Sequence, residues 1–357
     1  MSWGNRVITM LEIDGSYGEA GGQILRTALS LSTLLKQPFR MFNIRKGRKK
    51  PGLMPQHLMC IRALAHISNA KVLGDTAGSQ EILFYPSVAK SGEYFFDIGT
   101  AGSVNLLLQA ILPALIFLKN RSSVTLVGGT HVPFSPTSHY ITEVFIPMLH
   151  TLGIRINAGI DHYGFYPKGG GKIHFDISPS KDIHKLRLLK RGEFKTIKLI
   201  SGVANLPISI AERQRDAALK NLAGHGLSSE SETVSVRSFG NGTFIFIKSE
   251  TDNCFAGFSS LGERGKKAEK VGEEAAIDFF DYSSSSACID SHLADQIVLY
   301  LAFAEGESSF TTSRITNHLL TNLRVIENFT GLKYAVEGEP GMPGKVILTG
   351  KAFSLYS

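Results

Sequence analysis

The chain has 357 residues, hydrophobic side chains at 43% of its positions and a formal net charge of +7 at pH 7. This length predicts two or three domains with packed cores. The nearest candidate for a membrane span, 106–118, is too short, so we expect no membrane association. The three cysteines are far apart and odd in number, which indicates neither a disulfide framework nor a zinc site.

Apolar periodicity predicts two successive units with the same order of strands and helices. The first unit contains strand 11–13, helix 23–35, strand 39–44, helix 55–67 and strands 70–73 and 81–85. The second contains strand 94–98, helix 103–118, strand 123–127, helix 140–149 and strands 154–160 and 172–177. A third, less complete unit has helices 293–304 and 317–329 and strands 308–312, 334–336 and 345–348.

Residues 181–282 differ in character from the three units, with Lys/Glu-rich segments and a polar exit of four serines. We interpret this stretch as an inserted α+β domain, which leaves 1–180 and 283–357 as the repeat domain. The pattern predicts an α/β (α+β) fold of three similar units in a pseudo-symmetric arrangement, with a smaller inserted domain.

A glycine-rich turn, 15–22, joins the first strand to the first helix. Glycines allow close approach of the backbone to a ligand, and a helix N-terminus favours an anion. Glu19 and Arg26 flank this turn, which suits a metal and a phosphate. The alternative is a tight turn with a solvated glutamate. The turn is not a P-loop, because no Gly-Lys-Ser/Thr follows the glycines.

Five basic residues crowd into six positions before Pro51, namely Arg45, Lys46, Arg48, Lys49 and Lys50. Such a cluster favours a polyanionic partner such as nucleic acid, although a solvated loop is the alternative.

Histidines near the third unit could carry chemistry. His318 follows polar Thr316 and Asn317 at the start of a predicted helix, where its ring could face a cavity. A neutral imidazole is a competent nucleophile, whereas the plain alternative is a capping or satisfied histidine; the same choice applies to His292. The loop 164–171, with three successive glycines, is interpreted as a hairpin loop.

Together these segments resemble the RNA 3′-terminal phosphate cyclase family along nearly the whole chain. The resemblance rests on several motifs in order: Gly21-Gly22-Gln23-Ile24-Leu25-Arg26, the basic loop 44–53, Gln56-His57-Leu58, 164–171, 292–296 and His318-Leu319-Leu320-Thr321-Asn322. It implies three βαβαββ units with an inserted domain. It also implies ATP-dependent conversion of RNA 3′-phosphate ends to 2′,3′-cyclic phosphodiesters, through a covalent histidine–AMP and an RNA-adenylate.

The resemblance also implies roles for single residues. His318 would be the catalytic nucleophile and Glu19 the ligand of Mg²⁺ or Mn²⁺. The phosphates of ATP would contact Arg26, Arg45, Arg48 and Gln56. The nucleotide-binding positions would be Gln109, His292, Leu293, Ala294, Asp295 and Gln296. Three positions depart from the family pattern: Ala20 stands where relatives often have a third glycine, Tyr163 stands where Arg or His is usual, and His292 replaces an aromatic residue of some relatives.

Three other functions compete with this interpretation: a non-catalytic cyclase-like protein of ribosome assembly, an enolpyruvyl-transferase-type enzyme and a plain RNA-binding module. The presence of His318 with Glu19, Arg26 and Arg45 argues against the non-catalytic protein and the plain RNA-binding module. The basic cluster argues against the enolpyruvyl-transferase-type enzyme. The expected partner is RNA with a 3′-phosphate end. The first ten residues lack a signal-peptide pattern, which predicts a cytoplasmic protein, or a nuclear one in a eukaryote. The oligomeric state stays open, a homodimer included.

Overall fold

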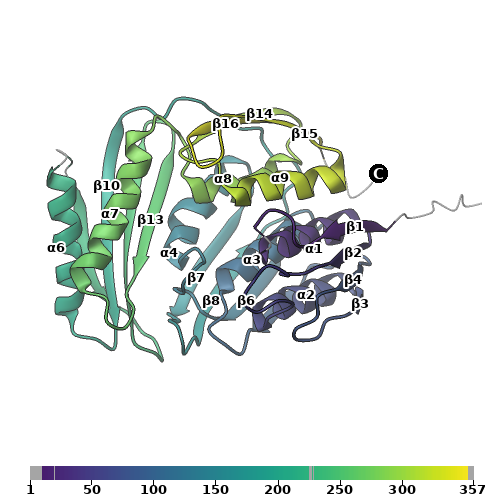
Figure 1. Cartoon of the computed structure of the whole chain (residues 1–357), viewed down its shortest axis with the longest axis horizontal. Helices are drawn as coiled ribbons and strands as arrows, with labels where there is room; N and C mark the ends of the chain where they lie inside the picture. Colours follow the sequence, from purple (N-terminus) through teal and green to yellow (C-terminus); the bar gives the residue numbers. More distant parts are fainter. Residues whose placement is uncertain (1–9, 20, 225–226, 228, 353–357) are drawn as a thin grey trace, which may run out of the picture.

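The computed structural model describes residues 10–19, 21–224, 227 and 229–352. It is a mixed α/β molecule, so the predicted fold class is confirmed. Figure 1 shows the segment from β10 to α7 at one end of the molecule and the other sheets and helices beside it. Within the described ranges, no helix combines the length and apolar character needed to cross a membrane.

Three four-stranded sheets share one topology: two parallel strands, then two strands added antiparallel. The first sheet has the strand order β1 (Leu11–Asp14), β2 (Phe39–Phe42), β4 (Ile82–Tyr85) and β3 (Lys71–Leu73). The second sheet has the order β5 (Glu93–Asp97), β6 (Ser122–Gly128), β8 (Gly171–Ile177) and β7 (Ile156–His162). The third sheet has the order β9 (Arg187–Leu188), β14 (Gly306–Thr312), β16 (Gly344–Gly350) and β15 (Lys333–Glu337). Each sheet buries one face against helices, which explains the alternating apolar residues of β8.

The helices of the three units meet in one hydrophobic core. They are α1 (Gln23–Leu35), α2 (Pro55–Ser68), α3 (Val104–Ile116), α4 (Ser138–Tyr140), α5 (Ile146–Thr151), α8 (Ser291–Leu301) and α9 (Asn317–Thr330), with the π-helical turn η1 (Ile141–Phe145) between α4 and α5. Helix α1 contacts α2, α3 and α9, and it is buried on nearly every side, its polar Thr27, Ser30, Ser32 and Thr33 included. This packing brings the glycine turn before α1 close to the start of α9 (Figure 1).

The remaining sheet belongs to the inserted segment. Its strands lie in the order β11 (Glu230–Ser235), β10 (Phe194–Ala204), β12 (Gly242–Thr251) and β13 (Phe255–Leu261). Helices α6 (Ile208–Gly224) and α7 (Ala268–Ser284) pack against each other and against this sheet. A separate apolar cluster holds these elements together, with Phe279 and Tyr282 of α7 fully buried in it.

The first strand of the third sheet differs from the expectation. Strand β9 lies inside 181–282, the range assigned to the inserted domain, yet it pairs in parallel with β14. A pairing of two residues leaves no apolar periodicity to find in a sequence. The inserted segment therefore separates the first strand of the third unit from its first helix, α8, and the exact domain boundaries remain a prediction.

Candidate active site

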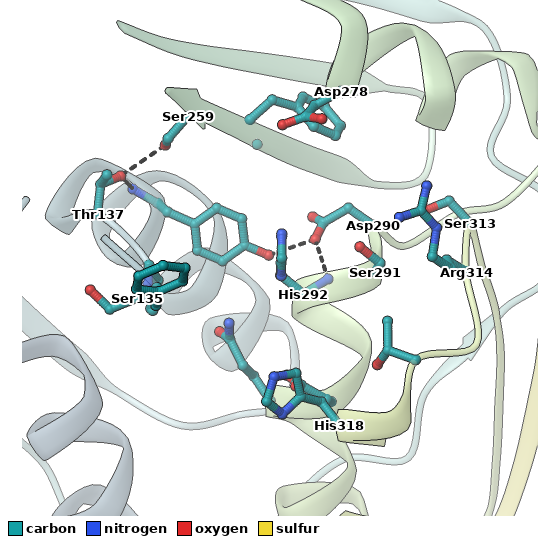
Figure 2. Close-up of a pocket in the computed structure, with 18 of the residues that line it drawn as sticks. Ser135, Thr137, Ser259, Asp278, Asp290, Ser291, His292, Ser313, Arg314 and His318 are labelled. Carbon is teal, nitrogen blue, oxygen red and sulfur yellow. Dashed lines mark hydrogen bonds between the residues drawn. The ribbon is translucent and has the colours of Figure 1, made fainter. Parts of the chain in front are cut away.

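A pocket of about 530 Å³ lies between the inserted segment and the N-terminal ends of helices α8 and α9. Its walls come from α1, α3, the turn 134–137, β13, α7, α8 and the segment 313–318. In Figure 2, His318 lies at one end of this pocket, with Ser259 and Asp278 of the inserted segment at the other. Asp290 and His292 lie between these ends (Figure 2).

His318 is the second residue of α9, and the Thr316 side chain caps this helix by accepting from the Leu319 N–H at 3.1 Å. The His318 Nε2 atom lies 2.9 Å from Oε2 of Glu19. Burial lowers the pKa of His318 to about 4, with Arg26 and other positive neighbours acting in the same direction. The imidazole is therefore neutral at physiological pH and retains a nitrogen lone pair.

The glycine turn is docked on helix α9, which is what places Glu19 beside His318. Gly18 has φ +64°, and a Cβ atom there would overlap the side chain of Thr321. Arg48 donates to the Glu19 carbonyl oxygen at 2.9 Å and lies 3.7 Å from its carboxylate. Burial raises the pKa of Glu19, while the charges of Arg48 and Arg26 oppose that shift.

Two arginines, Arg26 and Arg45, lie near His57, whose ring is close to Gly22 at the start of α1. Burial lowers the pKa of Arg26, and within the described part of the chain its guanidinium has no hydrogen-bond or ion-pair partner. Burial, Arg26 and Arg45 together lower the pKa of His57 to about 3, so its ring adds no positive charge. A buried guanidinium group without an anion, such as that of Arg26, is costly, which makes this place suited to an oxyanion.

The remaining residues of the predicted phosphate set make local contacts. Arg45 donates to the carbonyl oxygen of Gly52 at 2.9 Å. Gln56 accepts from the Ser103 N–H at 3.3 Å, which ties the start of α2 to the start of α3. None of these contacts saturates a guanidinium group, which carries five N–H donors.

Helix α8 splits the predicted nucleotide-binding positions between two faces. His292, Asp295 and Gln296 line the pocket, whereas Leu293 and Ala294 are fully buried in the core. Residues three and four apart share a helix face, so the two groups point apart. Leu293 and Ala294 thus support α8, and only their backbone is left to face a ligand.

Asp295 is held in place from two sides. Gln23 donates to its carboxylate at 3.1 Å, and Asn322 donates to its carbonyl oxygen at 2.8 Å. Burial raises the pKa of Asp295 to about 6, although the Gln23 hydrogen bond opposes the shift. Asp295 is therefore mainly ionised at neutral pH and can accept hydrogen bonds from hydroxyl groups.

Buried polar atoms without partners gather at the pocket. In the described part of the chain they include Nε2 of Gln109, Oε1 of Gln296, Oδ2 of Asp290 and Nδ1 of His318, all on pocket-lining residues. Buried polar groups in folded proteins almost always have partners. Their concentration here indicates that the pocket binds a polar ligand.

A sequence profile described as RNA 3′-terminal phosphate cyclase matches residues 17–336. The chain belongs to this family. A Pyrococcus abyssi protein named RNA 3′-terminal phosphate cyclase is 44% identical to this chain, and the match covers 94% of this chain and 98% of that protein. A Methanosarcina barkeri protein of the same name is 43% identical to this chain, and the match covers 93% of this chain and 98% of that protein. Among solved structures, the enolpyruvyl transferase NikO of Streptomyces tendae is 10% identical, covering 98% of this chain and 50% of that chain with a TM-score of 0.39.

Membership of the cyclase family makes this chain an enzyme. The lining of the active-site pocket also includes residues that the sequence alone did not single out. Asp278, Asp281 and Tyr282 come from the inserted segment, and Arg314 lies 3.5 Å from Asp281. Phe134 is fully exposed at the pocket rim with φ +61°. An unusual backbone at an exposed aromatic cannot be seen in a sequence, and the insert residues reach the pocket only through packing.

No group of three or more His, Cys, Asp or Glu side chains that could hold a metal occurs among the described residues of this cyclase-family chain. Glu19 lies beside His318 and Arg48, which makes it the carboxylate to consider for Mg²⁺ or Mn²⁺. Mg²⁺ commonly binds through one or two carboxylates, water and substrate phosphates, so one glutamate beside an anion site fits. The metal remains a prediction.

Proposed function

We propose that this chain is an ATP-dependent RNA 3′-terminal phosphate cyclase, which converts RNA 3′-phosphate ends to 2′,3′-cyclic phosphodiesters. The relatives are named for this activity. The observation that carries the catalytic part is a neutral His318 in the pocket, beside Glu19 and the arginines around His57.

In the proposed mechanism, a ring nitrogen of His318 attacks the α-phosphorus of ATP and expels pyrophosphate. AMP then moves from His318 to the RNA 3′-phosphate, which forms an RNA-adenylate. The neighbouring 2′-hydroxyl attacks the activated phosphorus, closes the cyclic phosphodiester and releases AMP. Adenylylation is needed because a phosphate monoester dianion is a poor electrophile, so covalent catalysis splits one difficult step into easier ones.

The surrounding residues position the phosphates and neutralise charge. Arg26 faces the anion site without a described partner, so it is available to a phosphate oxygen. A divalent metal at Glu19 would neutralise charge on the triphosphate. Gln109 and Gln296 carry buried polar atoms without partners, and these atoms are available to the nucleoside. The Asp295 carboxylate offers further acceptor oxygens. Fixed charges of this kind act with little reorganisation during the reaction.

The test is to incubate the protein with α-labelled ATP and a divalent metal, without RNA, and to measure acid-labile label on the protein. We expect label on the wild type and none on His318→Ala. Label absent from the wild type, or undiminished in His318→Ala, would contradict the mechanism. Absent label with retained RNA binding would favour the non-catalytic alternative.

The metal role is tested with Glu19→Gln. We expect slower label formation and a weaker dependence on metal concentration, because the variant removes the proposed carboxylate ligand. The matched control is Glu263→Gln, an exposed glutamate of the inserted segment. An unchanged metal titration in Glu19→Gln would count against this assignment.

A further inference from the structure

Exposed aromatic rings gather where the second sheet meets the inserted segment. The His162 and Phe239 rings stack with centroids 5.4 Å apart and an angle of 15°. Phe239 is 61% exposed, and Tyr166, on the loop after His162, is 68% exposed. Large rings left in water on two loops that contact each other indicate a binding surface more often than isolated exposed residues do. We call His162, Tyr166, Lys168, Arg237 and Phe239 the aromatic shelf.

The glycine triplet of loop 164–171 supports this shelf. A Cβ atom at Gly170 would lie 3.1 Å from the Phe239 ring, and Gly170 has φ +73°. Tyr163 N–H donates to the carbonyl oxygen of Arg237 at 2.8 Å, which joins the two loops. Gly240 in turn packs on the side chain of Lys168. Both loops are therefore held in fixed positions, and the exposed rings are presented by packed backbone.

The charge beside the rings is positive. Lys168 and Arg237 are exposed. The carboxylate of Asp161 is paired with Lys172 at 3.2 Å, so it does not offset them. An open groove beside Phe239 continues along Arg237, Asn205 and Pro207. Stacking rings beside positive charges are the combination that binds single-stranded nucleic acid.

A short segment connects the shelf with the active-site pocket. Thr130 accepts from the Gly164 N–H at 2.9 Å through its hydroxyl group, and His131 N–H donates to the Gly164 carbonyl oxygen at 3.0 Å. The chain then reaches Phe134 and Thr137, which line the pocket. Thr130 and His131, which contact the loop that carries the shelf, thus lie only three to four positions along the chain from Phe134 at the pocket wall.

We propose that the aromatic shelf binds the single-stranded RNA upstream of its 3′-phosphate, while the 3′ end occupies the active-site pocket. This proposal rests on the proposed cyclase function. Bases stack on Phe239 and Tyr166, and Lys168 and Arg237 contact the phosphate backbone.

The test compares two substrates for each variant: a 3′-phosphorylated RNA of roughly 12 nucleotides, long enough for such a surface, and a dinucleotide 3′-phosphate. Phe239→Ala should raise KM for the long RNA about tenfold and leave KM for the dinucleotide unchanged. Phe239→Trp should keep KM for the long RNA near the wild-type value, because it retains a stacking ring. Phe95→Ala, which removes a ring 64% exposed on β5, is the matched control.

The electrostatic part is tested by fluorescence anisotropy of the labelled long RNA at several salt concentrations. Lys168→Ala should reduce the slope of log affinity against log salt by about 1. An unchanged KM for the long RNA in Phe239→Ala, or an equal rise for both substrates, would overturn the proposal. A change in oligomeric state without a change in RNA affinity would also overturn it, in favour of a second copy.

Label formation from ATP alone separates the two proposals. It should be unchanged in Phe239→Ala and Lys168→Ala, since neither residue lines the active-site pocket. Wild-type protein that forms no label contradicts the histidine–AMP mechanism, whereas the anisotropy measurement still decides whether the shelf binds RNA.

Discussion

The same physical cause acts in opposite directions on two side chains of the active-site pocket. Burial lowers the pKa of His318 and raises that of Asp295, because both groups are harder to charge away from water. A neutral imidazole is thereby available as a nucleophile. His57 follows the same rule, and its neutral ring avoids adding charge between Arg26 and Arg45.

Arg26 and Lys49 offer a comparison of two basic residues from the same predicted anion site. Arg26 faces the site without a described partner, whereas Lys49 is exposed to solvent. We expect Arg26→Ala to reduce label formation from ATP more than Lys49→Ala does, with Arg26→Lys in between, because only arginine offers a planar pair of donors to phosphate. Rates of label formation measure this. Equal losses would mean that the phosphate site lies elsewhere.

At the scale of elements, the site depends on how helices begin. The first turns of α8 and α9 both face the active-site pocket, and each is capped by a side chain. Asp290 accepts from the backbone N–H groups of His292 and Leu293 at 2.9 and 3.0 Å, and from the Tyr140 hydroxyl at 2.8 Å. This cap joins the second unit to the third.

Substitution of Asp290 should therefore affect stability. We expect Asp290→Ala to lower the free energy of unfolding by about 2 kcal/mol, because it removes the cap and leaves a buried tyrosine hydroxyl unpaired. Asp290→Asn keeps a capping oxygen and should cost less. Denaturant unfolding of both variants measures the difference, and equal losses would show that the cap contributes little.

At the scale of the whole molecule, buried histidines join the second unit to the inserted segment. His131 and His139 lie 2.9 Å apart between ring nitrogens, and both rings pack against Phe244 of β12. Burial lowers the pKa of His139 to about 4, and burial together with the neighbouring His139 lowers the pKa of His131 well below its ordinary value of 6.5. Their neutral forms are therefore part of the packing between the two regions.

This burial predicts acid sensitivity. Between about pH 6.5 and pH 4 the unfolded chain binds protons at these histidines and the folded chain does not, so the free energy of unfolding falls as the pH falls. Denaturant unfolding across this range should show the loss. His139→Leu should flatten the pH dependence even if it lowers stability at neutral pH. A slope unchanged by His139→Leu would exclude this histidine as a cause.

The elements were largely predictable from the sequence because their signals are local. The periodicity of α1, α3 and α9 and the alternation in β8 indicate buried faces whatever the partner. Strand β9 was missed, since two paired residues carry no period. Residue types in the glycine turn and at the start of α9 predicted an anion site and a nucleophile, but as separate features.

Their meeting was decided by tertiary structure alone. Glu19 and His318 are 2.9 Å apart across almost the whole chain, because α1 packs against α9 and Gly18 leaves room for Thr321. The pocket wall from α7, the inward face of α8 and the low pKa of His318 likewise arise from burial among distant segments. The sequence by itself thus determined which elements form and which residues are chemically able. Packing and desolvation decided which of those residues meet and in which charge state.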